Sequence, residues 1–176
     1  VLRIMSKEAG KLSSDVNNYS YILDTSHKTS VMSLIIDSKK LNKVNNNTSL
    51  NSKVQERGYV DYFDKEGEGF SINVGLKLFG GSTRSYKKKS YEIKFKKKYG
   101  DAKLKYKVFK NVDSSVFDSL VLRTGSQDEF QYNDQRTVIK DVVATSLMGK
   151  YTDVDVQDYV PIVLYINGKY WGIYFI

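Results

Sequence analysis

Apolar and polar residues alternate along several segments of the chain, and this two-residue period is typical of β-strands. The clearest run is 70–78, where five large apolar residues occupy every second position. A shorter apolar run over 58–63 precedes it, and a glycine-containing polar segment over 64–69 separates the two. The pattern therefore predicts an antiparallel β-hairpin.

Other apolar runs predict more short strands. The last two are separated by Asn167-Gly168, the preferred pair for a two-residue type I′ turn. The run at 119–122 is continuous, so we expect it to be buried on both faces. The Asn- and Lys-rich segment 38–52 is expected to be a loop. The further predicted strands are 31–36, 89–95, 104–108, 119–122, 159–166 and 170–176.

One helix is predicted, over 134–148, where apolar residues recur at helical spacing. Asn133 or Asp134 can cap its start, and Gly149 suits its end. Several antiparallel strands with one major helix indicate an α+β fold, with a twisted antiparallel sheet. The chain stops at Ile176 within an apolar strand, so we expect further sequence in the intact protein.

Composition narrows the chemistry. The 176 residues carry a net charge of +8 and include no cysteine and one histidine, His27. Thiolate chemistry is excluded, and histidine triads or multi-histidine metal sites are not expected. No apolar run approaches the ~20 residues that span a membrane. Residues 87–110 hold 11 lysines against two acidic residues, which indicates either a solvated strand face or a surface for polyanions.

The turn Gly80-Gly81-Ser82 is the strongest candidate for a ligand site. Successive backbone N–H groups in a glycine turn can bind an anion, and Arg84 adds a cation. Lys89 shares a strand face with the apolar side chains of the strand that follows, which suits a phosphate-bearing ligand. The alternatives are an ordinary strand connection and a lysine that reaches solvent.

Two further charged residues are candidates. Arg123 directly follows a buried strand and needs an anionic partner if enclosed: Asp128, Asp141 or a ligand phosphate. Asp141 lies at the edge of the helical apolar stripe, facing the sheet. From there its carboxylate could pair with the Lys89 ammonium group and hold it in position, as a helix carboxylate does in protein kinases. The alternative is that Asp141 pairs with a neighbour on its own helix or with solvent.

These residues also form a recognisable pattern. Gly80-Gly81-Ser82-x-Arg84 followed by Lys89-Ser90-Tyr91 resembles the CotH-type spore coat protein kinase family, a group of atypical protein kinases. Three more segments resemble the family: 117–123, 137–147 and 159–174. In the segment 137–147, the family's usual Arg-Asp pair is replaced by Lys140-Asp141. The resemblance as a whole spans 58–176.

The resemblance implies a kinase-like N-lobe over 58–176, with 1–57 as an N-terminal extension. It implies ATP and Mg²⁺ as cofactors and phosphoryl transfer to serine or threonine of coat or surface proteins, at the spore coat or surface of a bacterium. Lys89 would contact the nucleotide phosphates and Asp141 would orient it, while the glycine turn, Arg84 and Arg123 would lie nearby. The family's catalytic and metal-binding acids are expected after Ile176. No catalytic or metal residue is therefore assigned within this chain, which alone should be inactive and bind ATP weakly.

Two alternatives remain open. The protein could be a pseudokinase that keeps the fold and scaffolds an assembly. It could instead be a non-catalytic module whose lysine-rich face binds teichoic acid, nucleic acid or an acidic coat protein. Nucleic acid is not the expected partner, because the tyrosines alternate as core residues and do not form an exposed stacking platform.

Overall fold

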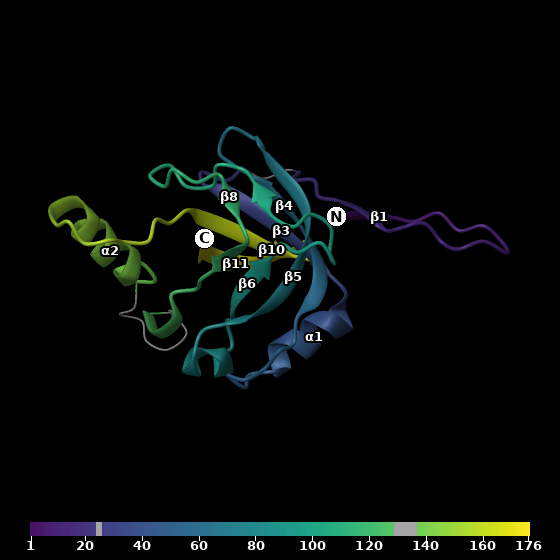
Figure 1. Cartoon of the computed structure of the whole chain (residues 1–176), viewed down its shortest axis with the longest axis horizontal. Coiled ribbons are helices and arrows are strands. Elements are labelled where there is room, and N and C mark those ends of the chain that lie inside the picture. Colours follow the sequence, from purple (N-terminus) through teal and green to yellow (C-terminus); the bar gives the residue numbers. More distant parts are fainter. Residues whose placement is uncertain (24–25, 129–136) are drawn as a thin grey trace.

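The computed structural model describes residues 1–23, 26–128 and 137–176. Its centre is a seven-stranded sheet with the order β11-β10-β3-β4-β5-β6-β9 (Figure 1). The α+β class predicted from the sequence is confirmed. The strands are β3 Ser30–Ile36, β4 Glu56–Phe63, β5 Gly69–Phe79, β6 Ser90–Lys94, β9 Ser119–Leu122, β10 Pro161–Ile166 and β11 Lys169–Phe175.

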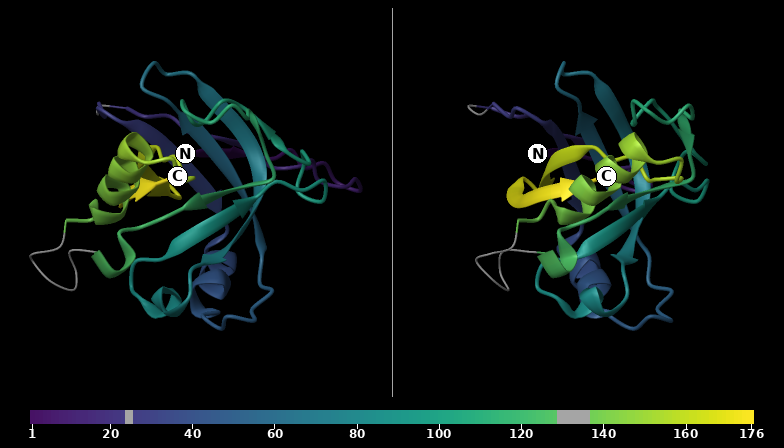
Figure 2. Two further views of the ribbon diagram at one scale, coloured as in Figure 1. Left: turned by 60° about the vertical axis from the view of Figure 1, so that its left-hand side comes forward. Right: turned by 90° about the vertical axis from the view of Figure 1, so that its left-hand side faces the viewer.

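The sheet is mixed: β10 and β3 pair in parallel, and every other pair of adjacent strands in the sheet is antiparallel. The expectation of a purely antiparallel sheet is therefore wrong at this one pair. The sheet also curls on itself (Figure 2). Arg123 and Phe175 exchange backbone hydrogen bonds of 2.7 and 2.8 Å, so the ends of the two edge strands β9 and β11 meet.

Both predicted hairpins are confirmed. Strand β4 pairs over its whole length with residues 69–76 of β5. Asn167 and Gly168 join β10 to β11 with φ angles of 52° and 79°, the two positive values that a type I′ turn requires. The predicted strand 104–108 is shorter in the structure. Its β7 (Leu104–Lys105) pairs with β8 (Val116–Phe117), and a separate hairpin of β1 (Leu2–Ile4) and β2 (Asn17–Tyr19) lies near the N-terminus.

The core follows the predicted alternation. Tyr91, Ile93 and Phe95 are buried on one face of the β6 segment, as expected for the side shared with Lys89. In β9, however, only Leu120 and Leu122 are buried, while Ser119 and Val121, which alternate with them, are half-buried. The prediction that 119–122 is buried on both faces is wrong, because β9 is an edge strand of the sheet.

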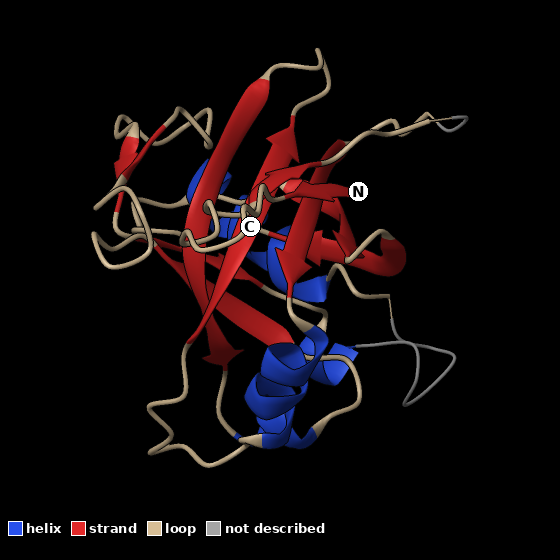
Figure 3. Ribbon diagram, turned by 90° about the vertical axis from the view of Figure 1, so that its right-hand side faces the viewer, coloured by secondary structure: helices blue, strands red, loops and turns tan. Residues whose placement is uncertain are grey.

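A helix, α1 (Ser38–Asn46), occupies the segment predicted to be a loop. Asp37 caps it: its Oδ1 accepts hydrogen bonds from the backbone N–H groups of Lys39 and Lys40 at 2.9 and 3.1 Å. Leu41 and Val44 are buried against the sheet. The loop prediction is wrong because one cap and two buried contacts outweigh the weak helix propensity of an Asn-rich segment. Figure 3 shows α1 at one end of the strands.

The one predicted helix is present but shifted. α2 spans Lys140–Tyr151 and runs through Gly149, the residue expected to end it. The expected caps, Asn133 and Asp134, lie outside the described residues. No residue of α2 is buried, and Val143 and Leu147 are about half exposed. The expectation that this helix packs on the sheet is therefore wrong, and it stands to one side (Figure 1).

The boundary suggested at residue 57 divides strands that belong to one sheet. β3 lies before this boundary, yet it is an interior strand between β10 and β4. Five of its seven residues are apolar, and all seven are buried. The segment 30–36 is therefore part of the same folded unit as the strands that follow.

Candidate functional site

The glycine turn after β5 forms the first wall of a pocket. Gly80 has a φ of 104°, a value that favours glycine, and the short 3-10 turn η1 (Ser82–Ser85) follows. Arg84 secures this turn: its Nε donates to the Gly80 carbonyl at 2.7 Å and its Nη1 to the Ser49 carbonyl at 2.8 Å. The Arg84 guanidinium therefore ties the turn to the loop after α1.

The end of β9 forms the second wall. Ser90 Oγ accepts a hydrogen bond from the buried Thr124 N–H at 3.1 Å, and Thr124 Oγ1 accepts one from Ser126 N–H at 2.9 Å. These bonds fix the turn η2 (Ser126–Asp128) to the first residue of β6. Arg123 therefore projects from a segment whose backbone is held on both sides.

Asp128 connects the second wall to the start of α2. Its carboxylate accepts hydrogen bonds from the N–H groups of Thr137 and Lys140, each at 3.2 Å, and from Thr137 Oγ1 at 3.0 Å. Lys140 Nζ lies 3.2 Å from the same carboxylate. Burial opposes ionisation of Asp128, but these donors outweigh it and lower its pKa to about 2. Ile139 is the N-cap residue and gives no side-chain cap, so Asp128 caps α2 from outside the helix by accepting the N–H of its first residue, Lys140.

A strained residue lies beside this cap. Val138 is buried and has a φ of 67°, a conformation that β-branched residues rarely adopt. Its N–H donates to the Asp128 carbonyl at 3.0 Å. Backbone strain of this kind persists only where the surroundings enforce it, and it is concentrated at functional sites.

The three parts enclose an open pocket of about 960 Å³. Within it, Arg123 Nη1 lies 2.5 Å from Asp141 Oδ2. The pocket therefore contains two cation–carboxylate pairs, Arg123 with Asp141 and Lys140 with Asp128. The lining residues are Phe79, Gly80, Gly81, Thr83, Ser90, Arg123, Gly125, Ser126, Gln127, Asp128, Lys140 and Asp141.

The structure brings four of the predicted site residues together. Gly80, Gly81, Arg123 and Asp141 all line the pocket. Of the partners that the sequence left open for Arg123, Asp141 is the one observed.

The other three predicted residues, Ser82, Arg84 and Lys89, are not among the lining residues. Lys89 Nζ donates to the Arg84 carbonyl at 2.5 Å, and burial lowers its pKa. The expected contact between Lys89 and Asp141 is replaced by the Arg123–Asp141 pair.

The family model described as CotH kinase protein matches residues 76–176. The chain belongs to this family. A comparison with curated proteins found no match. The matched region contains every residue that lines the pocket, so the pocket lies within the family-matched part of the chain. This family membership makes the chain kinase-like.

Asp128 and Lys140 are the charged residues of the pocket that the sequence did not assign to the site. Asp128 was considered only as a partner of Arg123, and Lys140 only as a departure from the family pattern. A local capping motif links residues three positions apart. Asp128 instead caps a helix that begins twelve residues later, so no short-range pattern could reveal it.

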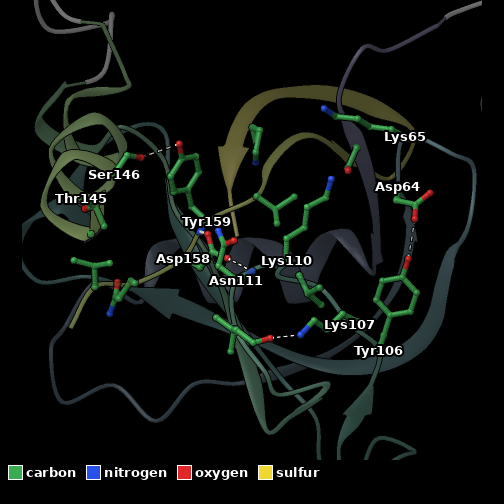
Figure 4. Close-up of a pocket in the computed structure, with 18 of the residues that line it drawn as sticks. Asp64, Lys65, Tyr106, Lys107, Lys110, Asn111, Thr145, Ser146, Asp158 and Tyr159 are labelled. Carbon is green, nitrogen blue, oxygen red and sulfur yellow. Dashed lines mark hydrogen bonds between the residues drawn. The ribbon is translucent and has the colours of Figure 1, made fainter. Parts of the chain in front are cut away.

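A second cavity, of about 840 Å³, lies between the later part of α2 and the loops near residues 64 and 110 (Figure 4). Ser146 Oγ is 3.0 Å from Tyr159 Oη on one side, and Tyr106 Oη donates to Asp64 Oδ2 at 3.0 Å on the other. The sequence did not predict this cavity. Because α2 borders both cavities, its two ends belong to different surfaces.

Two further properties concern membrane-spanning helices and metal ligands. Among the residues that the structure describes, no helix is long and apolar enough to cross a membrane. The same residues bring together no group of three His, Cys, Asp or Glu side chains suited to hold a metal ion.

Proposed function

We propose that this chain is the nucleotide-binding lobe of an atypical Ser/Thr protein kinase that transfers the γ-phosphate of ATP to coat or surface proteins of a bacterium. One observation carries the proposal. Gly80, Gly81, Arg123 and Asp141, which come from three separate segments, converge on one pocket inside the region matched by the family model.

The pocket fits a phosphate-bearing ligand. Its volume of about 960 Å³ is within the range of small-molecule sites. A Cβ placed on Gly81 would meet no atom within 4 Å, so the turn leaves open space beside its backbone. The Arg123 side chain is 40% exposed and can therefore turn from Asp141 to phosphate oxygens, which a guanidinium binds in bidentate fashion.

The pocket does not present a metal site. Its two carboxylates, Asp128 and Asp141, are already paired with Lys140 and Arg123, respectively. The Mg²⁺ that the family implies therefore has no ligand set among the described residues.

In this proposal the residues bind and orient the ligand. Arg123 binds the phosphates, Asp141 holds the guanidinium until the ligand arrives, and Asp128 positions both by capping α2. Lys89 remains a proposed phosphate ligand beside the glycine turn. To act as one it must exchange the Arg84 carbonyl for a phosphate oxygen, and its lowered pKa is consistent with a partly desolvated ammonium.

A phosphorylation assay on the full-length protein tests the proposal. Arg123→Ala and Lys89→Ala should each lower the rate roughly a hundredfold, as expected for the loss of a group that binds transferred charge. Lys39→Ala, an exposed lysine on α1, is the matched control and should leave the rate unchanged. Wild-type activity in Arg123→Ala would remove the pocket from the mechanism, and wild-type activity in Lys89→Ala would remove that lysine.

A non-catalytic scaffold is the second candidate, and one observation favours it. Each cation in the pocket already has a carboxylate partner, so the pocket is neutral without a ligand. The phosphorylation assay on the full-length protein addresses this candidate, because absence of transfer by the wild type would favour it. Titration of the 176-residue chain with Mg-ATP tests a separate expectation. We expect weak binding or none by the chain alone, and micromolar affinity would contradict that expectation.

A further inference from the structure

The helix α2 carries the Asp141 side of the pocket, yet packing does not hold this helix in place. No residue of α2 is buried, and its N-cap residue, Ile139, gives no side-chain cap. Val138, which directly precedes Ile139, differs from the helix because it is only 7% exposed. The position of the first turn of α2, and with it the reach of Asp141, therefore depends on how Val138 is held.

Val138 is held against Gly125, in the segment that follows β9. A Cβ built on Gly125 would lie 3.0 Å from both the Cα and the Cγ1 of Val138, and 3.3 Å from the carbonyl carbon of Asp128. At these distances a neighbour would have to shift, so the two segments approach as closely as they do because residue 125 has no side chain. Gly125 is not among the glycines with positive φ. The position therefore uses the small size of glycine and not its backbone freedom.

The contact keeps Val138 in a backbone conformation that valine disfavours. Its φ of 67° is strained for a β-branched residue, and strain of this kind persists only where the surroundings enforce it. Those surroundings are Gly125 and the 3.0 Å hydrogen bond from the Val138 N–H to the Asp128 carbonyl. On either side of Val138, the N–H groups of Thr137 and Lys140 both reach the Asp128 carboxylate, each at 3.2 Å.

The two residues in contact lie close in sequence to the ion pair of the pocket. Gly125 is two residues after Arg123, and Val138 is three residues before Asp141. The Gly125–Val138 contact thus joins the same two segments as the Arg123–Asp141 pair, whose Nη1 and Oδ2 atoms are 2.5 Å apart. Val138 does not line the pocket, so it can influence the pocket only through its neighbours in the chain and Asp128.

We propose that Gly125 and Val138 are positioning residues, whose contact fixes the first turn of α2 so that Asp141 meets Arg123 across the pocket. The consequence for catalysis rests on the proposed function, in which Arg123 binds the phosphates of the nucleotide. The contact itself requires no nucleotide.

Carboxyl titration by NMR tests the contact on the 176-residue chain. Gly125→Ala adds one methyl group at the contact and should displace Val138. The N–H donors of the first turn then move away from Asp128, so its pKa should rise from about 2 toward the ordinary value of 3.8. Gly81→Ala is the matched control for this measurement. Gly81 also has a negative φ, −96°, but its added Cβ would meet no atom within 4 Å, so the pKa of Asp128 should stay near 2.

Substitution of Val138 provides the converse test. Glycine adopts a φ of 67° without strain, so Val138→Gly should keep the turn and leave the pKa of Asp128 near 2. It also removes Cγ1, one of the two Val138 atoms that a Cβ at position 125 would meet. In the Val138→Gly background, Gly125→Ala should therefore shift the pKa of Asp128 less than it does in the wild type.

A further variant keeps the test decisive if Gly125→Ala does not fold. Val138→Ala deletes the Cγ1 contact but leaves a residue with a Cβ in the left-handed conformation. The pKa of Asp128 should then rise in Val138→Ala and not in Val138→Gly.

Phosphorylation kinetics of the full-length protein connect the contact to the proposed function. Gly125→Ala should lower kcat/KM for ATP by about tenfold or more, because a misplacement of about 1 Å can cost roughly a hundredfold. The loss should be smaller in the double variant with Val138→Gly. A rate that follows the pKa of Asp128 across the variants distinguishes positioning from a general loss of stability.

Four results would overturn the inference. The pKa of Asp128 could stay near 2 in folded Gly125→Ala, rise equally in Gly81→Ala, or shift by the same amount whether residue 138 is valine or glycine. A raised pKa with a wild-type rate of transfer would also remove the positioning role. Absence of transfer by the wild-type full-length protein would instead defeat the proposed function, and the titrations would still decide whether the contact fixes α2.

Discussion

Replacing Tyr99 by phenylalanine should stabilise the protein. The Tyr99 side chain packs over Gly75 of β5 and is 6% exposed. Its hydroxyl oxygen is buried and has no hydrogen-bond partner in the described part of the chain. A buried hydroxyl without a partner loses its hydration and gains nothing in return. Removing it should therefore raise the free energy of unfolding.

The magnitude follows from the cost of an unpaired buried polar group, about 1–3 kcal/mol. In a domain of this size, each kcal/mol shifts the melting temperature by roughly 2–4 °C. Tyr99→Phe should therefore melt several degrees above the wild type. The ring itself is retained, so packing against Gly75 is unchanged.

Tyr106→Phe is the matched control with the opposite sign. The Tyr106 hydroxyl donates to Asp64 Oδ2 at 3.0 Å, and burial together with this carboxylate raises the pKa of Tyr106 to about 12. Removing a hydrogen bond to a charged group should lower the free energy of unfolding by about 1.5 kcal/mol. The two substitutions delete the same atom, so their difference reports only the environment of the hydroxyl.

Urea unfolding followed by circular dichroism measures both variants against the wild type. The reasoning requires that Tyr99→Phe be more stable than the wild type and Tyr106→Phe less stable. A Tyr99→Phe variant that loses stability to a similar extent as Tyr106→Phe would refute it, because the Tyr99 hydroxyl would then have a stabilising partner.

Two further predictions concern the helix caps. Asp37→Ala should lower the free energy of unfolding by about 1 kcal/mol, because the first turn of α1 loses two hydrogen bonds; thermal denaturation would show this, and an unchanged melting temperature would contradict it. For Asp128, the folded pKa of about 2 lies below the ordinary value of 3.8, so its stabilising contribution is complete above pH 3.8 and is lost as the pH falls toward 2. Carboxyl titration by NMR should place Asp128 near 2, and Asp128→Asn should flatten the pH dependence of stability in this window. Titration of Asp128 near 3.8 would show that it does not cap α2.

Part of the candidate site was accessible from the sequence because its residues belong to local motifs. The Gly80-Gly81 turn, Arg123 after a strand and Asp141 on a helix were each singled out by their neighbours in the chain. The structure brings these four into one pocket. In the structure, Lys89 Nζ is hydrogen-bonded to the Arg84 carbonyl, and Asp141 pairs with Arg123 and not with Lys89. No rule based on sequence spacing could predict which of the two cations contacts Asp141.

The sequence by itself determined the strands of the central sheet and the tight turn of the last hairpin, because a two-residue alternation and an Asn-Gly pair act over a few residues. Tertiary structure alone decided that β3 pairs in parallel with β10, some 130 residues away along the chain. It also decided that 38–46 is a helix and that Asp128 accepts a hydrogen bond from the start of α2, twelve residues further along the chain. These outcomes depend on which surfaces are buried together and on which donors meet a carboxylate in space, and neither is encoded in local periodicity.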